Sequence, residues 1–432
     1  MNIDTLITDA RFLVTCDERG TVLEQAGIAI DDGRIVAVGD VDGFTAETTI
    51  DATGCIVLPG LVNLHTHLPM TLLRGIAENV DLQGFLERVW AEEARIMGPT
   101  GAYLGARLGA LEALLAGTTT TLDMYLHPEA AHRGAVEVGI RHAIGPVYFD
   151  FAGPDGLEWS ERIELTRKWP TILADIGGPF VPCYLMPHSP LLVNPEHLSD
   201  LNAIARELGA RIHTHTSEND KENADTVAAH GARPTALLRG AGLLDDRTTL
   251  AHCVRLDDAD RAAIATGGAS IAHNPGSNLK LASGAMDLVG YRNQGITVGL
   301  GTDGCSSSND LDMFAVMRLA ANLARLVNDD PAAISAQEIV RAATIDGARA
   351  IGMADRIGSL EEGKEADIIV IDAAVPHLTP LHDPCTALVY AAGRGDVRDV
   401  LVAGRQVVAE HRPTLVEAHE VMAAARAHVE AG

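Results

Sequence analysis

Four short apolar runs in this chain each end in residues that bind metal ions. The runs are VLPGLVNLHTH, GARIHTHTSE, TTLAHC and ITVGLGTDG, and they end in His65, His67, His215, His252 and Asp303. Each run has the length and composition of a buried strand. The C-terminal ends of parallel barrel strands meet at one face, where such a barrel keeps its chemistry. Imidazoles and a carboxylate gathered there suit a borderline divalent cation such as zinc. The sequence therefore predicts a parallel barrel with a metal centre.

Strand-length apolar runs alternate with helix-length segments through the middle of the chain. Segments such as PEHLSDLNAIAREL carry helical periodicity. Eight alternations are what a (β/α)8 barrel requires. The candidate strands lie near 56–65, 118–124, 141–149, 180–187, 210–216, 248–252, 268–273 and 296–302.

The two ends of the chain have a different pattern, with short strands and tight turns. Near the start, an Asp-Asp-Gly turn at 31–33 separates two apolar stretches, which is a hairpin signal. Near the end, EADIIVIDA and VRDVLVAGRQVVAEHR show the same pattern of short apolar strands and tight turns. We therefore expect an α/β protein with a TIM-like (β/α)8 barrel over 58–362. A small β-sandwich is expected from both termini, 1–57 and 363–432.

Composition excludes several classes of function. The formal net charge of −26 argues against binding a phosphate backbone, which needs a surplus of Lys and Arg. No apolar run is long enough to span a membrane, and no signal peptide is evident at the start. The six cysteines show no CxxC pair and are expected to be reduced thiols. We expect a cytoplasmic homo-oligomer that acts on a small molecule, without nucleic-acid or membrane partners.

The metal-binding residues can be assigned from strand geometry. Residues i and i+2 of a strand face the same side, so His65 and His67 can both point into the barrel. In the run at 210–216, we choose His215 as the third ligand and expect His213, one pleat deeper, in the core behind it. Asp303 completes the set as a ligand or as the base for a bound water.

The sequence of the fourth predicted strand indicates one metal ion rather than two. Barrels with two metals commonly use a carbamylated lysine at the end of the fourth strand, and PFVPCYLMPHSP contains no lysine. Zinc is the first choice from the ligand types, and Fe²⁺ tolerates the same ligands.

Two further residues are placed for acid–base chemistry. A metal with an open position lowers the pKa of its water from ~15.7 to about 7. Attack of that water on an aromatic heterocycle also needs protonation of the neighbouring ring nitrogen. Glu218, beside His215, is placed to shuttle that proton, and His252 to orient the water. The alternatives are an exposed loop carboxylate for Glu218 and a core histidine for His252.

Taken together, these motifs resemble the amidohydrolase superfamily, in particular the branch of 5′-methylthioadenosine/S-adenosylhomocysteine deaminases and triazine chlorohydrolases. The resemblance implies that His65, His67, His215 and Asp303 bind the metal, that Glu218 is the proton shuttle and that His252 assists the water. It is carried by PGLVNLHTHLPMTLLRG at 59–75, PHSP at 187–190, HTSE at 215–218, AHC at 251–253, HNPGSNLKLASG at 273–284, GTDGCSSSNDLDMF at 301–314 and IGSLEEGKEADIIVID at 357–372.

The resemblance also suggests substrate-binding residues. Glu93 matches a position that binds ribose hydroxyls, and His188 one that contacts a nucleoside; the alternatives are a surface helix carboxylate and a loop histidine. Asn278 and Ser307 are expected to line the pocket. Related deaminases often carry an arginine after the third strand, suited to a homocysteine carboxylate, but GPVYFDFAGPD has neither Arg nor Lys. Arg162 is the candidate substitute, and a surface helix arginine is the alternative.

The expected function is metal-dependent hydrolytic deamination of an aminated heterocycle. An adenosine-type nucleoside is favoured, of the 5′-methylthioadenosine or S-adenosylhomocysteine class, with attack by metal-activated water and release of ammonia. The alternatives are deamination of a free base or pterin, removal of chloride or an alkylamine from an s-triazine, and a scaffold without catalysis. The H-x-E and P-C-x-x-C signature of the unrelated zinc deaminases is absent.

Overall fold

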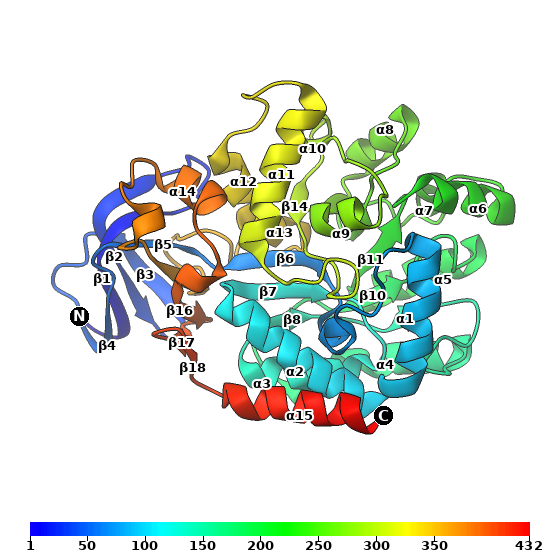
Figure 1. Ribbon diagram of the computed structural model, residues 1–432, viewed down its shortest axis with the longest axis horizontal. Coiled ribbons are helices and arrows are strands. Elements are labelled where there is room, and N and C mark those ends of the chain that lie inside the picture. Colours follow the sequence, from blue (N-terminus) through cyan, green and yellow to red (C-terminus); the bar gives the residue numbers. More distant parts are fainter.

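The centre of the molecule is a ring of parallel strands surrounded by helices (Figure 1). The computed structural model describes residues 1–432. The predicted (β/α)8 barrel is confirmed. Six of the eight predicted strands each match one observed strand, whereas 56–65 and 141–149 each cover two. The barrel strands are β6 (Leu61–Thr66), β7 (Thr118–Asp123), β8 (Arg141–Ala143), β9 (Val147–Tyr148), β10 (Tyr184–Pro187), β11 (Arg211–Thr216), β12 (Thr248–His252), β13 (Ser270–His273) and β14 (Val298–Leu300).

The third position of the barrel is shared by two short strands. β8 pairs with β7, and β9 pairs with β10. Pro146 lies between them and has no N–H to give to a strand ladder, which is consistent with the break.

The ring closes where β14 meets β6. Asn63 Nδ2 donates to Thr302 Oγ1 at 2.8 Å, and Thr302 N–H donates back to Asn63 Oδ1 at 3.0 Å. One residue further on, Asp303 N–H donates to the His65 carbonyl at 2.9 Å. Two predicted metal ligands are therefore joined through the backbone that closes the barrel.

Helices connect the strands, and many of them begin and end at capping residues. Asn194 Oδ1 accepts the N–H of His197 at the start of α5, and Gly209 ends this helix with a positive φ of 62°. The helices of this part are η1 (Leu68–Leu73), α1 (Leu82–Ile96), α2 (Pro99–Leu115), α3 (Pro128–Val138), α4 (Trp159–Ile176), α5 (Pro195–Leu208), α6 (Asp220–His230), α7 (Pro234–Gly240), α8 (Asp258–Gly267), α9 (Pro275–Lys280), α10 (Leu288–Asn293), α11 (Met313–Asn328), α12 (Ala336–Ala342) and α13 (Ile345–Ala350). None of the helices in the structure is both long and apolar enough to cross a membrane.

Both termini form one sheet beside the barrel, as expected. The sheet has nine strands in the order β18-β17-β16-β15-β5-β1-β2-β3, with β4 on β1, and its own hydrophobic cluster. Asp32 and Gly33 both have positive φ in the predicted hairpin turn. The strands are β1 (Asn2–Val14), β2 (Val22–Asp31), β3 (Arg34–Gly39), β4 (Thr45–Asp51), β5 (Cys55–Pro59), β15 (Ile368–Asp372), β16 (Val397–Val402), β17 (Arg405–Ala409) and β18 (Arg412–Pro413).

The C-terminal segment also contains helices that touch the barrel. α15 (Ala418–Ala431) packs against α2, as its red ribbon shows in Figure 1, and His428 Nε2 donates to the Ile96 carbonyl at 2.8 Å. α14 (Pro384–Tyr390) packs against α11 and α12. The remaining short helices are η2 (Pro376–Leu378) and η3 (Arg394–Asp396). The boundaries 1–57, 58–362 and 363–432 stay a prediction.

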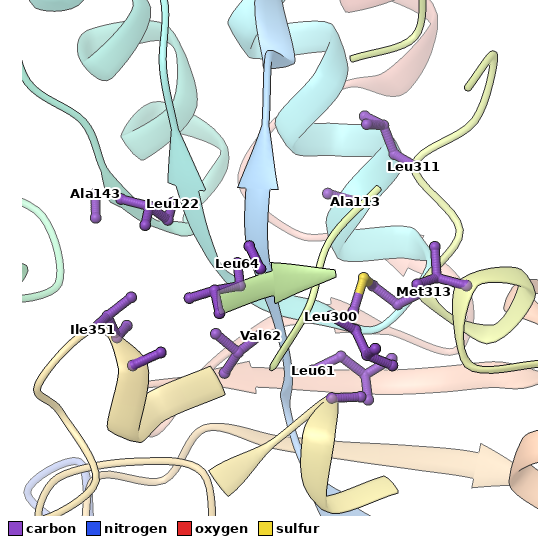
Figure 2. Close-up of a cluster of buried hydrophobic side chains, with 14 of the residues drawn as sticks. Leu61, Val62, Leu64, Ala113, Leu122, Ala143, Leu300, Leu311, Met313 and Ile351 are labelled. Carbon is purple, nitrogen blue, oxygen red and sulfur yellow. The ribbon is translucent and has the colours of Figure 1, made fainter. Parts of the chain in front are cut away.

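Strand β6 runs directly from the terminal sheet to the predicted metal centre. It follows β5 after a single residue, Gly60, where an added Cβ would lie 2.1 Å from Thr119 Oγ1. Leu61, Val62 and Leu64 are fully buried in the cluster drawn in Figure 2, together with Leu300 of β14. Burial on both faces is typical of parallel strands. This packing fixes the register of β6 and so the direction of its histidines.

A buried ion cluster joins the barrel to the C-terminal part of the chain. Arg141 of β8 contacts Glu365 Oε2 at 2.6 Å and Asp367 Oδ1 at 2.9 Å, and its side chain is fully buried. Asp367 Oδ1 also accepts the N–H of Ala403 at 2.7 Å, and Arg356 pairs with Glu365. Removing Arg141 would leave Asp367 buried without a cationic partner and Glu365 paired with Arg356 alone.

We expect Arg141→Met to lower the free energy of unfolding by about 3–5 kcal/mol, because breaking a buried ion pair leaves uncompensated charge. Urea denaturation followed by circular dichroism measures the change. The control is Arg206→Met, because Arg206 is 61% exposed and 3.3 Å from Asp245, where an ion pair contributes little. Equal effects of the two substitutions would contradict the structural role of Arg141.

Candidate active site

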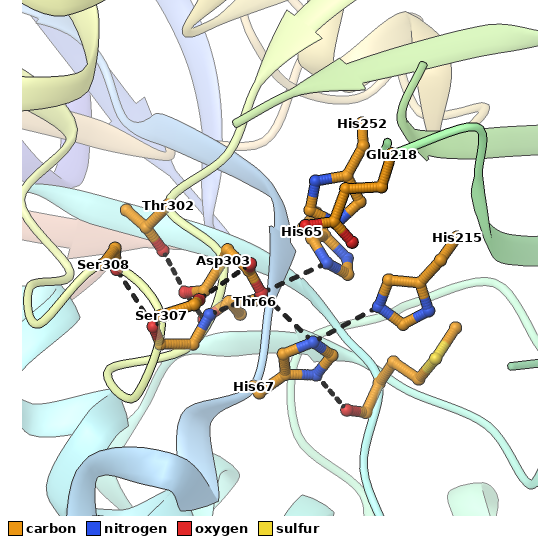
Figure 3. Close-up of polar contacts among 12 residues, drawn as sticks. His65, Thr66, His67, His215, Glu218, His252, Thr302, Asp303, Ser307 and Ser308 are labelled. Carbon is orange, nitrogen blue, oxygen red and sulfur yellow. Dashed lines mark hydrogen bonds and ion pairs between the residues drawn. The ribbon is translucent and has the colours of Figure 1, made fainter. Parts of the chain in front are cut away.

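Four histidines and one aspartate meet at the C-terminal ends of the barrel strands (Figure 3). The two predicted strand ends His65 and His67 point their Nε2 atoms at Asp303 Oδ1, at 3.4 and 3.2 Å. His215 Nε2 lies 3.4 Å from His67 Nε2, and His252 groups with His65 and His215. Donors around one tetrahedral ion at 2.0–2.1 Å are separated by roughly 3.3 Å, so these spacings suit a single cation.

The outer nitrogens of three of these histidines are held by fixed acceptors. His67 Nδ1 donates to the Met124 carbonyl at 2.5 Å, and His215 Nδ1 donates to the His188 carbonyl at 2.7 Å. His252 Nδ1 donates to Asn278 Oδ1 at 2.9 Å. With Nδ1 protonated, each Nε2 offers a lone pair to the centre, which is how proteins orient metal-binding histidines.

His65 is oriented by a second histidine. His213 Nδ1 donates to the Thr249 carbonyl at 2.9 Å, so its Nε2 accepts from His65 Nδ1 at 2.8 Å. This leaves the fully buried His65 Nε2 without a hydrogen-bond partner. Burial holds the pKa of His65 well below its ordinary value, which favours the neutral, metal-binding form. A divalent cation therefore fits the site. His213 is buried in the core, as expected, and it supports His65 rather than His215.

Asp303 is held by the loop that follows it. Its Oδ1 accepts the N–H of Gly304 at 2.7 Å, and its Oδ2 accepts the hydroxyl of Ser307 at 2.8 Å. Asp303 has a φ of 62° and His252 a φ of 72°, conformations that side-chain-bearing residues adopt at an energetic cost. The strand ends thus turn sharply at the site.

Glu218 lies in the same pocket as these residues. It is 6% exposed, so the alternative of an exposed loop carboxylate is wrong. Its Oε2 lies 3.8 Å from His252 Nε2, and Ser283 Oγ donates to its Oε1 at 3.4 Å. Burial raises the pKa of Glu218, which favours a carboxyl group able to carry a proton. His252 likewise faces the pocket through Nε2.

Glu93 and His188 also line the pocket. Glu93 of α1 is 5% exposed and accepts the hydroxyl of Tyr125 at 2.7 Å; burial raises its pKa to about 7. The alternative of a surface helix carboxylate is therefore wrong. The ring of His188 lies 4.6 Å from that of His215 and 5.1 Å from that of Phe149, between centroids.

Three predicted substrate-binding residues do not line this pocket. Asn278 lies behind His252 and Ser307 behind Asp303, each hydrogen-bonded to the residue in front of it. Asn278 lies in the short helix α9, and Ser307 lies in the turn that follows Asp303. Arg162 is buried rather than on the surface, and it pairs with Asp155 at 2.5 Å. The expectation that these three contact a substrate is not supported by their positions.

Sequence reasoning missed several pocket residues. Tyr125 lies two residues after β7, the second barrel strand. It could have been found because functional residues of such barrels lie at the C-terminal ends of the strands. Glu222, four residues after Glu218 on the next helix, accepts the N–H of Glu218 at 2.6 Å, and burial raises its pKa to about 7. The aromatic wall formed by Trp90 and Phe149 has no local signal in the sequence.

Comparison with known proteins places this site among related enzymes. The pattern of the Amidohydrolase family matches residues 56–407. A 5-methylthioadenosine/S-adenosylhomocysteine deaminase from Syntrophobacter fumaroxidans is 37% identical over 97% of this chain and 96% of its own. The crystal structure of an adenosine deaminase from Xanthomonas campestris with bound zinc has a TM-score of 0.94 and 36% identity, over 100% of this chain and 98% of that one. Atrazine chlorohydrolase TrzN from Arthrobacter aurescens TC1, complexed with zinc, has a TM-score of 0.91 and 29% identity, over 98% and 100%.

We expect His67→Ala to lose bound metal and activity together, because it removes one of the clustered donors. Elemental analysis of the purified protein should give about one divalent ion per wild-type chain and far less in the variant. The control is His419→Ala, because His419 is 77% exposed in the C-terminal helix, and it should keep the metal. Full metal in His67→Ala would refute the ligand assignment.

Glu218→Gln should retain the metal and lose a factor of about 10²–10⁴ in turnover, the usual contribution of general acid–base catalysis. Steady-state ammonia release, with metal content measured on the same sample, tests this. An unchanged rate would place the proton shuttle elsewhere.

Proposed function

The chain belongs to the amidohydrolase family, and from that premise we propose that it hydrolytically deaminates an adenine nucleoside and releases ammonia. The observation that carries the proposal is the pairing, in one pocket, of a metal-binding cluster with a separate buried carboxylate, Glu93. The metal-binding cluster is suited to hydrolysis at the aminated ring. Glu93 is suited to binding the hydroxyls of a sugar.

The proposed metal is a single zinc ion, with Fe²⁺ as the alternative. His65, His67, His215 and Asp303 would hold it, and His252 has its Nε2 beside the same group. When bound, such an ion supplies Lewis acidity that makes a water molecule nucleophilic near neutral pH. The zinc-containing relatives support this choice.

The side chains around the centre supply the proton transfers. Water adds to the ring carbon that bears the amino group, and Glu218 gives a proton to the neighbouring ring nitrogen. The raised pKa of Glu218 keeps that proton available. One proton of the added water returns to Glu218, which restores its starting state. The other goes to the amino group, which leaves as ammonia, and a carbonyl forms on the ring. His252, 3.8 Å from Glu218, orients the water and stabilises the charge that develops on its oxygen.

Glu93 and His188 would orient the nucleoside. The free oxygen of Glu93 can accept hydrogen bonds from both ribose hydroxyls, while Tyr125 holds the other oxygen. The ring of His188 lies beside His215 and so next to the position of the base. Burial makes these contacts strong, because a charged hydrogen bond contributes more where water is excluded.

A second candidate function is hydrolysis of an s-triazine, supported by the similarity to atrazine chlorohydrolase. A triazine has no sugar hydroxyls, so the buried Glu93 would face an apolar substrate at a desolvation cost. Deamination of a free base or pterin leaves Glu93 equally unused. We therefore favour the nucleoside. A homo-oligomeric state and a cytoplasmic location stay predictions, and sedimentation velocity would test the first.

The proposal predicts different effects of Glu93→Ala on two kinds of substrate. Loss of charged hydrogen bonds to ribose should lower kcat/KM for an adenine nucleoside by about 10- to 100-fold. Any turnover of free adenine should barely change. The measurement is ammonia release by metal-loaded enzyme across adenine nucleosides, free bases, pterins and triazines.

Phe85→Leu, a change in an apolar lining residue of the same helix, is the matched control. No turnover of any nucleoside by the wild-type enzyme would refute the proposed function. Equal losses on nucleoside and base would refute the role of Glu93.

A further inference from the structure

The pocket wall on the side of Glu93 is apolar and carries no positive charge. Of the 25 residues that line the pocket, 14 are hydrophobic and none is Arg or Lys. Trp90 and Phe149 line this wall, and Phe151, outside the lining, contacts both rings at 6.2 and 5.3 Å between ring centroids. The charged groups that line the pocket, apart from histidines, are carboxylates.

The basic residue behind Phe149 is already paired with a carboxylate. Arg162 lies directly behind it: its Nη1 donates to the Val147 carbonyl at 3.0 Å, and its Cζ lies 5.2 Å from the centroid of Phe149. Asp155 holds the same guanidinium with two hydrogen bonds, at 2.5 and 3.0 Å, and both side chains are 2% exposed. Phe149 therefore separates a paired, buried cation from the pocket.

The cations of the neighbouring loops have acidic partners as well. Lys280 Nζ lies 3.2 Å from Glu78, and Arg255 Nε lies 3.6 Å from Asp220. A negatively charged group entering the pocket would thus meet apolar side chains and carboxylates, and the lining holds no Arg or Lys to pair with it.

Resting on the proposed function, we infer that this pocket selects adenine nucleosides whose 5′ substituent is uncharged, such as a methylthio group, and discriminates against the amino-acid tail of S-adenosylhomocysteine. The physical reason is desolvation. An α-carboxylate loses hydration against the wall of Trp90 and Phe149 without gaining a cationic partner, because the lining holds no Arg or Lys. A thioether loses little on burial and makes favourable contacts with aromatic rings.

The test is a substrate series on the wild-type, metal-loaded enzyme. It compares kcat/KM for 5′-methylthioadenosine, S-adenosylhomocysteine and 5′-butylthio-5′-deoxyadenosine. The butylthio tail has as many carbons as homocysteine but no charge, so it separates the effect of charge from that of length. We expect the two uncharged thioethers to react within about threefold of each other, and S-adenosylhomocysteine to react about 10- to 100-fold less efficiently.

The outcomes distinguish this inference from the proposed function. Equal efficiency with S-adenosylhomocysteine and 5′-methylthioadenosine would overturn the inference and leave deamination intact. A butylthio compound as slow as S-adenosylhomocysteine would overturn it too, because length would then be the cause. Failure to deaminate any nucleoside would refute the proposed function itself.

A double variant tests whether Arg162 reaches the substrate. Replacing a buried ion pair by apolar residues of similar volume is often tolerated, so Arg162→Met with Asp155→Leu removes the pair without leaving a lone charge. We expect the ratio of the two kcat/KM values, S-adenosylhomocysteine over 5′-methylthioadenosine, to stay within about twofold of wild type. A selective loss on S-adenosylhomocysteine would show that Arg162 binds its tail and would overturn the inference. If the double variant does not fold, the wild-type series decides.

Discussion

The closure of the barrel between β14 and β6 is the constraint on which the site depends. The hydrogen bond from Asp303 N–H to the His65 carbonyl joins the last strand to the first, and the side chains of the same two residues approach to 3.4 Å. The reciprocal bonds between Asn63 and Thr302 fix the register just before this point. The strand register that closes the barrel therefore also sets the spacing of the metal-binding side chains. A shift in that register would separate them.

Around this centre, hydrogen bonds orient each side chain before any ligand arrives. The carbonyls of Met124, His188 and Thr249 fix histidine tautomers directly or through His213. Met124 and His188 directly follow β7 and β10, and Thr249 lies in β12, so these acceptors cannot be rearranged without disturbing the barrel. Preorganisation of this kind reduces the cost of holding a cation and of developing charge in the pocket.

The rest of the pocket combines burial with negative charge. Glu218 and Glu93 are both nearly inaccessible to solvent, and burial raises the pKa of each. One is placed to carry a proton beside the metal cluster, and the other is placed to accept hydrogen bonds with the help of Tyr125. Beside Glu93 the pocket wall is apolar, and Arg162 behind this wall is paired with Asp155. In the proposed function, substrate specificity depends on the absence of Arg and Lys from the pocket lining as much as on the carboxylates that are present.

The sequence by itself determined the barrel, its eight strands and the cluster of His65, His67, His215, His252 and Asp303. Strand and helix periodicities are local signals, and parallel strands bring their ends together wherever the ring closes. Only the tertiary structure decided that Asn278 and Ser307 lie behind the centre, that Arg162 is paired with Asp155, and that α15 packs on the barrel. Those positions depend on loop paths and on contacts between segments far apart in the chain. No periodic pattern encodes such contacts, because their energy comes from partners that only the folded chain brings together.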